Sequence, residues 1–182
     1  MATAEKIQDE TSVVYSLEEP RFERIFGAEY AMSSPSFKHQ NVLLAIGAQL
    51  REKLYSSGCK TIVAPFDVYP LFEKGDEYTL VQPDVFLSCD NSKLKENCYK
   101  GSPKFIIEIL SSNRSHDMVT KLNLYEKAGV NEYWIIDPEE QIIITFELVN
   151  GRYVCRNYLG EDEVTLVTIP GCTIDFKKVF AN

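Results

Sequence analysis

Two acidic residues in the middle of the sequence have the surroundings that metal-assisted hydrolysis requires. Glu108 lies in the nearly unbroken apolar run 104–110, which predicts a strand buried on both faces. An ionised carboxylate there would be costly without a cation, a hydrogen-bond network or a raised pKa. Asp84, at the start of an earlier predicted strand, adds a second carboxylate. Two carboxylates and a substrate phosphate are enough to hold Mg²⁺, which activates water and stabilises developing charge.

A positive charge for the same site comes from the helix expected at 115–128. The apolar residues of this helix share one stripe: Met118, Leu122 and Tyr125. The side chain of Lys121 projects from that stripe and not from the solvated face of the helix. Asp117 precedes it by one turn. We therefore expect three carboxylates and one ammonium to gather, with Lys121 assisting the attacking water or stabilising the transition state.

Each of these residues also has a purely structural interpretation. Asp84 follows a proline and could cap a turn, and Lys121 could form an ion pair with Asp117. Glu108 is the most informative of the three, because isolated buried carboxylates are rare. His39 shares a helical stripe with apolar residues, where a hydrogen-bonded core histidine is the simpler interpretation, and we keep it as an accessory candidate.

The elements that must position these side chains are helices and strands in alternation. Apolar spacing predicts a first helix from about 36 to 56, ending near Gly58, and the second helix at 115–128. The predicted strands are 61–64, 68–71, 79–81, 83–87, 104–110, 133–136, 142–148, 152–158 and 164–169. The strand, helix and strand between 104 and 136 form a βαβ crossover, which places the two strands in parallel.

These elements predict an α/β (mixed α+β) fold with a central mixed sheet flanked by helices. Asn150-Gly151 predicts a hairpin turn in an additional C-terminal pair of strands. With 182 residues, we expect one domain made of an N-terminal arm (1–20), a core (36–138) and a C-terminal β extension (142–176). Short apolar pieces at 12–15 and 29–32 suit an arm or an irregular strand pair.

Charge and cysteine usage restrict the classes of protein. The chain has 19 Lys and Arg against 27 Asp and Glu, a formal net charge of −8 that argues against a broad nucleic-acid-binding surface. A divalent cation can still neutralise charge where a phosphate must sit. The five cysteines include no CxxC pair, and we expect reduced thiols. No signal segment or long apolar stretch is present, so we expect a cytoplasmic protein without membrane contact.

Taken together, the motifs resemble the Uma-two family of the PD-(D/E)xK nuclease superfamily. The matching features are Pro83-Asp84, Glu108, Ser111-Ser112, Asp117-x-x-x-Lys121, Tyr125 and the run from Gly129 to Pro138. The resemblance covers roughly residues 20 to 170 and implies a restriction-endonuclease-like core. Where the superfamily motif has its lysine, two residues after Glu108, this sequence has Leu110. The family places that lysine on the following helix, which corresponds to Lys121.

The resemblance also implies roles for individual residues. Asp84, Glu108 and the carbonyl of Ile109 would hold Mg²⁺ or Mn²⁺, and Lys121 would complete the catalytic set. Asp117 and His39, which matches a histidine frequent in the family, would be accessory residues. The implied activity is hydrolysis of phosphodiester bonds, with DNA as the expected substrate and a homodimer as a compatible assembly.

Two other hypotheses stay open. The first is a binding or regulatory module that keeps the nuclease fold without turnover, motivated by the net charge and by Leu110. The second is an assembly protein whose C-terminal hairpin pairs subunits, because edge strands invite association. The sequence contains no Gly-rich phosphate loop, GxSxG elbow or HExxH motif, so nucleotide hydrolases, serine esterases and zinc peptidases receive no support.

Overall fold

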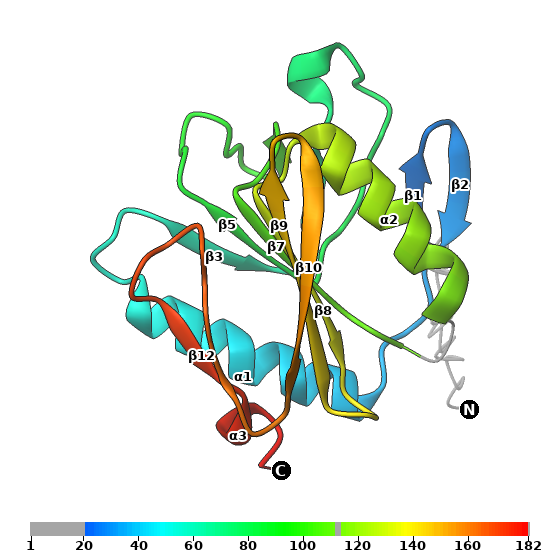
Figure 1. Cartoon of the computed structure of the whole chain (residues 1–182). Coiled ribbons are helices and arrows are strands. Elements are labelled where there is room, and N and C mark those ends of the chain that lie inside the picture. Colours follow the sequence, from blue (N-terminus) through cyan, green and yellow to red (C-terminus); the bar gives the residue numbers. More distant parts are fainter. Residues whose placement is uncertain (1–20, 112–113, 182) are drawn as a thin grey trace, which may run out of the picture.

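A six-stranded mixed sheet with helices on both faces forms the body of the protein (Figure 1). The computed structural model describes residues 21–111 and 114–181, without the side chains of 114–117. The predicted arm at 1–20 lies outside the described residues. In chain order the elements are β1 (Phe22–Ile25), β2 (Ala28–Ala31), α1 (Phe37–Lys53), β3 (Lys60–Val63), β4 (Asp67–Tyr69), η1 (Phe72–Lys74), β5 (Val85–Ser88), β6 (Cys98–Lys100), β7 (Phe105–Ile109), α2 (Arg114–Ala128), β8 (Glu132–Asp137), β9 (Ile142–Val149), β10 (Arg152–Leu159), β11 (Glu163–Thr165), β12 (Thr173–Asp175) and α3 (Phe176–Val179).

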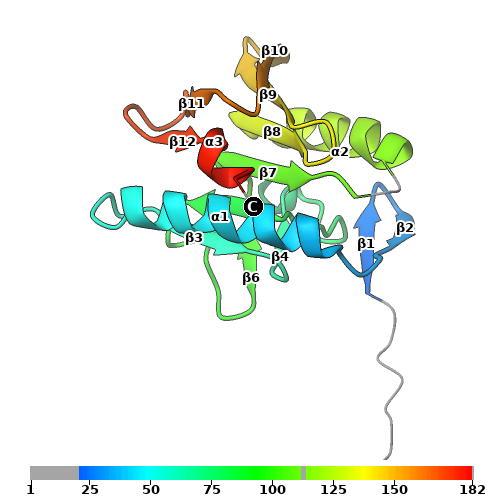
Figure 2. The same cartoon turned by 90° about the horizontal axis from the view of Figure 1, so that it is seen from below.

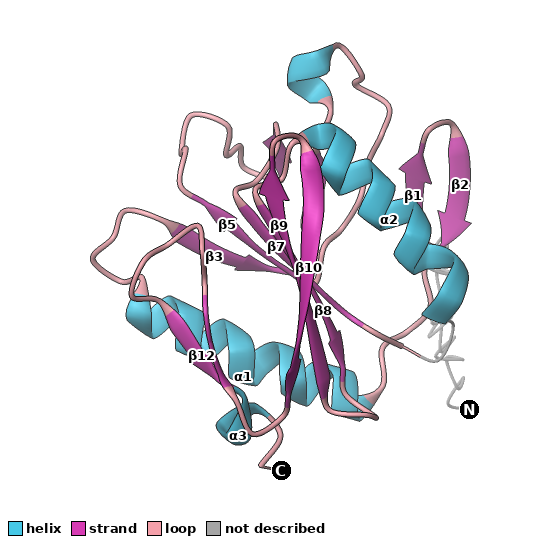
Figure 3. Ribbon diagram, in the orientation of Figure 1, coloured by secondary structure: helices cyan, strands magenta, loops and turns pink. Residues whose placement is uncertain are grey.

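The strand order of the large sheet is β10-β9-β8-β7-β5-β3 (Figure 3). β7 and β8 are parallel and are joined by α2, while every other neighbouring pair in this sheet is antiparallel. The predicted crossover, mixed sheet and β9–β10 hairpin are therefore confirmed. Three two-stranded sheets, β1-β2, β4-β6 and β11-β12, complete the described part of the chain.

The alternation of side chains along β7 divides the core between the two faces of the sheet. Ile107 belongs to the apolar cluster that α1 covers, whereas Ile106 belongs to the cluster that contains Leu124 and Tyr125 of α2. Figure 2 shows α1 and α2 on opposite sides of the sheet. Because residues two apart share a face, Glu108 lies on the α2 side together with Ile106. The sheet thus presents the carboxylate to the helix that carries Lys121.

The predicted helix boundaries are close to the observed ones. Helix α1 begins after Ser36, whose side chain accepts a hydrogen bond from the backbone of His39, a favourable N-cap. It ends at Lys53, earlier than predicted, because Leu54 leaves the helical conformation and caps it. Helix α2 begins at Arg114, one residue before the predicted start. No described helix is both long and apolar enough to cross a membrane.

Several short strands were predicted wrongly. The piece 79–81 forms only isolated bridges, through Leu80 and Val81, and the strand expected at 164–169 is limited to β11. The segment 29–32, expected as an arm or part of an irregular strand pair, overlaps β2 of the β1–β2 hairpin. The strands β1, β6 and β12 and the short helix α3 were not predicted. These segments are three or four residues long, and such lengths give a periodic pattern too little room to appear.

The prediction that all five cysteines are reduced is wrong for two of them. Cys59 and Cys89 form a disulfide with a Cα–Cα distance of 4.1 Å, and they directly extend the antiparallel β3–β5 pair. Pairing across 29 intervening residues brings the two cysteines together, which their spacing in the sequence could not show. The other three, Cys98, Cys155 and Cys172, are free thiols.

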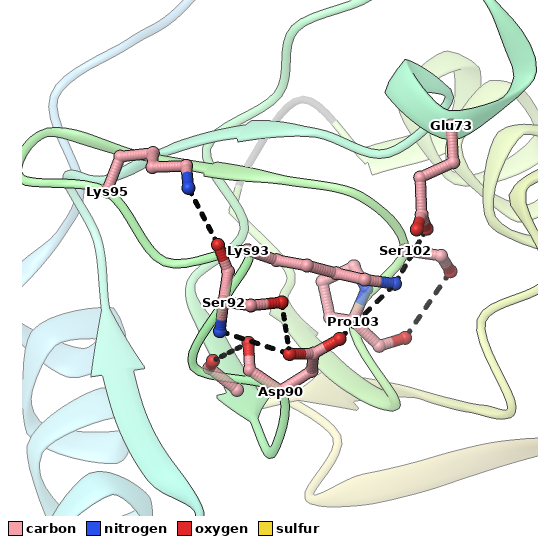
Figure 4. A network of polar contacts seen from close by, with 8 residues as sticks. Glu73, Asp90, Ser92, Lys93, Lys95, Ser102 and Pro103 are labelled. Carbon is pink, nitrogen blue, oxygen red and sulfur yellow. Dashed lines mark hydrogen bonds and ion pairs between the residues drawn. The ribbon is translucent and has the colours of Figure 1, made fainter.

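A polar network organises the loop that follows this disulfide (Figure 4). Asp90 Oδ1 accepts hydrogen bonds from the backbone and hydroxyl of Ser92. Lys93 Nζ lies 2.7 Å from Glu73 Oε2 and 3.9 Å from Asp90 Oδ2. Glu73 and Asp90 thus neutralise Lys93 at the surface, and the network has a structural role in the loop.

The outer edge of β10 is partly closed. The backbone N–H of Tyr153 donates to Glu126 Oε2, and that of Leu159 donates to Asp162 Oδ2. Side chains therefore take two backbone donors that a second copy would need for strand pairing, a common protection of sheet edges. The geometry argues against assembly through the whole length of this edge, and a homodimer stays a prediction.

We predict that Ile107→Ala lowers the free energy of unfolding by about 2–5 kcal/mol, the usual cost of a large-to-small change in a core. Ile107 is 0% exposed at the centre of the sheet. Val154→Ala on β10 is the control, since Val154 is 47% exposed and its truncation should change stability little. Chemical denaturation measures both, and equal effects would contradict the assignment of Ile107 to the core.

Candidate functional site

The register of β5 against β7 brings Asp84 and Glu108 to the same place. Val85 pairs with Ile107 in an antiparallel ladder, so one further step places Asp84 opposite Glu108. Asp84 Oδ2 accepts a hydrogen bond of 2.7 Å from the backbone N–H of Ile109. This bond ties the aspartate to β7 at the point where the strand ends.

Glu108 is held by two groups of α2. Its Oε1 accepts a hydrogen bond of 2.7 Å from the Tyr125 hydroxyl and lies 3.1 Å from Lys121 Nζ. Glu108 and Lys121 are only 8% and 6% exposed. The inward direction predicted for Lys121 is therefore confirmed, and the ammonium lies beside the carboxylate that the sequence singled out.

A third carboxylate, Glu23 of β1, completes the polar cluster. Its Oε2 lies 3.0 Å from Lys121 Nζ, and its Oε1 accepts a hydrogen bond of 2.9 Å from the backbone N–H of Gln82. Glu23 is 4% exposed. The lysine is thus shared between two buried carboxylates on different elements.

His39 contacts the site from the first turn of α1. Its Nε2 lies 3.2 Å from Asp84 Oδ2, while its Nδ1 is buried without a hydrogen-bond partner among the described residues. The interpretation of His39 as a fully hydrogen-bonded core histidine is therefore wrong for one of its two ring nitrogens. The contact places His39 beside Asp84, and its accessory role stays a prediction.

These side chains line a cavity of about 470 Å³. Its floor includes Asp84, Glu108 and Lys121, and the β1–β2 hairpin contributes Glu23 and Tyr30 to its wall. The other lining residues are Arg21, Ala31, Met32, Ser33, Pro35, His39, Gln40, Ala64, Pro65, Gln82, Ile109 and Ser111. The volume falls within the range of small-molecule and cofactor pockets.

Burial dominates the electrostatics of the site. It raises the pKa of Glu108 from 4.5 to about 8; the Lys121 ammonium opposes this, while the charges of Asp84 and Glu23 add to it. Burial and the neighbouring Glu108 carboxylate raise the pKa of Tyr125 well above its usual value, so this residue is a hydrogen-bond donor. Among the described side chains, the carboxyl groups of Asp84, Glu108 and Glu23 gather around the Lys121 ammonium, and Arg21 also lines the cavity. A divalent cation beside Asp84 and Glu108 would favour the ionised form of Glu108.

The donor atoms of the site are compatible with such a cation. Both described hydrogen bonds of the Asp84 side chain fall on Oδ2, and both described side-chain contacts of Glu108 fall on Oε1. Oδ1 and Oε2 are therefore left without a described protein partner. Within residues 21–111 and 114–181, no group of three or more His, Cys, Asp or Glu residues is arranged as a metal site. Mg²⁺ does not require one, because it keeps several waters and binds through one or two carboxylates together with phosphate oxygens.

Two of the predicted site roles are not tested by the structure. The side chain of Asp117 lies outside the described residues. The backbone N–H of Ile109 contacts Asp84, whereas the metal-ligand role expected for its carbonyl stays a prediction.

Comparison with known proteins identifies the family and the fold. A family model described as "Uma2: Putative restriction endonuclease" matches residues 10–177. The chain belongs to the Uma2 family. A crystal structure of "a putative nuclease belonging to DUF820" from Anabaena variabilis ATCC 29413 superposes with a TM-score of 0.73 at 19% sequence identity, covering 89% of this chain and 90% of that chain. No curated protein matches the sequence. The family and the structural likeness show a nuclease-type α/β fold around the mixed sheet.

In this Uma2 protein, Glu23 is the site residue that the sequence analysis missed. A signal was present, because Phe22-Glu23-Arg24-Ile25 alternates between exposed and buried residues and puts Glu23 on the same face as the buried Ile25. Four residues are too few for this alternation to stand out. The partner of Glu23 lies 98 positions away on α2, a separation that no local pattern can bridge.

Proposed function

We propose that the protein is a divalent-metal-dependent endonuclease that hydrolyses phosphodiester bonds in DNA. The supporting observation is that Asp84 and Glu108, from adjacent strands, face one cavity beside the buried ammonium of Lys121. Membership of the Uma2 family supports the coarser statement, a nuclease. The choice of metal, the choice of DNA and the roles of individual residues are our proposals.

The chain's own residues prepare the site for Mg²⁺ or Mn²⁺. Asp84 and Glu108 would hold the cation through Oδ1 and Oε2, the oxygens without a described protein partner, together with the carbonyl of Ile109. Bound there, the cation would lower the pKa of a coordinated water and stabilise the charge that develops on the phosphate. His39 and the Ile109 N–H fix the orientation of Asp84 by occupying its other oxygen.

Lys121 and Tyr125 perform the corresponding task on α2. Tyr125 donates to Glu108 Oε1 and keeps the carboxylate in one orientation. The Lys121 ammonium, 3.1 Å from the same oxygen, carries a fixed positive charge at the floor of the cavity. Such a preorganised charge stabilises a negatively charged transition state without reorganising during the reaction. In the proposed chemistry, Lys121 therefore stabilises the transition state electrostatically.

The direct test incubates the purified protein with supercoiled plasmid, single-stranded DNA and RNA in Mg²⁺, Mn²⁺, Ca²⁺ or EDTA. We expect cutting of DNA with Mg²⁺ or Mn²⁺ and none with EDTA. Cutting of RNA alone would overturn the proposal that DNA is the substrate. Binding of DNA and Mn²⁺ without cutting would overturn the proposed enzymatic activity. It would indicate instead a binding or regulatory module without turnover, which the net charge of −8 also suggests.

A further inference from the structure

We propose that Glu23 is a positioning residue of the site, which holds Lys121 at the cavity floor and fixes the segment that leads into Asp84. The inference rests on the proposed nuclease function and assigns a role to a residue outside the Asp84, Glu108 and Lys121 set. Glu23 comes from the β1–β2 hairpin, an element separate from the large sheet. Its two carboxylate oxygens contact different parts of the site: Oε2 contacts Lys121 on α2, and Oε1 contacts the backbone of Gln82 just before β5.

The first half is the lysine on α2. Glu23 Oε2 lies 3.0 Å from Lys121 Nζ, with both side chains almost fully buried. A buried ammonium is stable only when carboxylates or other acceptors compensate for its lost hydration. Glu108 Oε1 lies 3.1 Å from the same ammonium, whose three N–H donors can serve both carboxylates at once. The two contacts together hold Lys121 between Glu23 and Glu108, the carboxylate proposed to receive the cation.

The second half is the chain entering β5. Glu23 Oε1 accepts from the backbone N–H of Gln82, two residues before Asp84. The neighbouring Arg24 exchanges two backbone hydrogen bonds of 2.8 Å with Leu80. The side-chain amide of Gln82 donates to Asp67 Oδ1, which holds the same segment from its other side. A displacement of Glu23 would therefore shift both Lys121 and the segment that positions Asp84.

The use of its oxygens distinguishes Glu23 from the proposed metal ligands. Both Glu23 oxygens contact protein donors, whereas Asp84 and Glu108 each keep one oxygen without a described partner. Glu23 thus acts through Lys121 and Gln82 and offers no free oxygen of its own to a cation.

The experiment compares Glu23→Gln with wild type under saturating metal. Glutamine keeps the acceptor for Gln82 and removes the negative charge beside Lys121. We expect kcat to fall about 10–100-fold with KM changed by less than about threefold, because the ammonium shifts while DNA binding persists. The matched control is Glu132→Gln, a carboxylate buried in β8 that binds Trp134 and Thr168 away from the cavity. It should leave kcat within about threefold of wild type.

A double-mutant cycle with Lys121→Met separates positioning from general destabilisation. If Glu23 acts through Lys121, adding Glu23→Gln to Lys121→Met should cost less than about a further twofold in kcat. If Glu23→Gln lowers kcat in the Lys121→Met background as much as it does in wild type, the proposal that Glu23 acts through Lys121 is overturned. Thermal melts of all variants check that each one is folded.

A spectroscopic measurement tests whether Glu23 positions Lys121 and does not require that the protein be active. A buried, ion-paired lysine gives a slowly exchanging ammonium signal in ¹H–¹⁵N correlation spectra, assigned here by its loss in Lys121→Met. We expect this signal in the metal-free wild type and in Glu132→Gln, and its shift or loss in Glu23→Gln. An unchanged Lys121 signal in folded Glu23→Gln would overturn the positioning role. Wild type that cuts no nucleic acid but shows the expected spectra would overturn the proposed function and leave the positioning intact.

Discussion

Glu108→Gln and Asp84→Asn are each expected to lower kcat for DNA cutting by about 10³-fold or more, the scale of losing a central member of a catalytic set. Both substitutions keep the size and most hydrogen bonds of the side chain and remove one negative charge. Asp84 still accepts from the Ile109 N–H after the change, and Glu108 still accepts from Tyr125. The expected loss therefore comes from weaker cation binding and not from a disrupted fold.

The interpretation depends on controls for folding and for contamination. Glu108→Gln removes an acid whose pKa burial raises to about 8, so the variant should be at least as stable as wild type near and above that pH. Glu132→Gln, buried at 1% exposure outside the cavity, tests whether any buried Glu→Gln change suffices. Cutting that persists in both site variants would show that other residues, or a contaminating nuclease, perform it.

Local patterns were sufficient to predict the central part of the site. Glu108 could be recognised because it interrupts an apolar run, and that run is the fully buried strand β7. Lys121 could be recognised because it sits on the apolar stripe of α2. The crossover between β7 and β8 also followed from short links and element order, since such connections have few alternatives.

The parts that the sequence could not predict depend on pairing over long distances. The placement of Asp84 opposite Glu108 requires the β5–β7 register, in which a slip of one residue would turn every side chain to the other face. The Cys59–Cys89 disulfide depends in the same way on the β3–β5 register. Glu23 was missed because its hairpin is short and its partners, Gln82 and Lys121, lie far along the chain.

This distinction explains why the three-residue motif was incomplete. When Glu108 is ionised, Asp84, Glu108 and Lys121 carry two negative charges and one positive charge, and burial delays that ionisation by raising the pKa of Glu108 to about 8. Adding Glu23 makes the site more negative and divides the lysine between two carboxylates. Ionising Glu108 beside Asp84 and Glu23 therefore costs free energy in the metal-free protein, and groups with strongly shifted pKa values are often found where a ligand binds. The charge balance of the site, and not its motif alone, is the reason to expect a cation.

The same charge balance predicts that metal affinity depends steeply on pH. Mn²⁺ must displace the proton from Glu108, whose pKa is about 8 in the metal-free protein. Below that pKa the apparent affinity should rise by about tenfold per pH unit, because one proton leaves for each cation bound. Titration calorimetry between about pH 6 and about pH 8, in buffers of different ionisation enthalpy, measures both the affinity and the released proton. Glu108→Gln should bind more weakly and lose this slope.

Stability without metal should move in the opposite direction. The pKa of Glu108 is higher in the folded protein than its ordinary value of 4.5, so the folded state holds the proton more tightly than the unfolded chain. This contribution to the free energy of unfolding is complete below about pH 4.5 and is lost as the pH rises through about 8. Mn²⁺ should restore stability most strongly at the upper end of that range, where the carboxylate is ionised. A metal-induced increase in melting temperature that is equal at pH 6 and pH 8 would show that Glu108 does not exchange its proton for the cation.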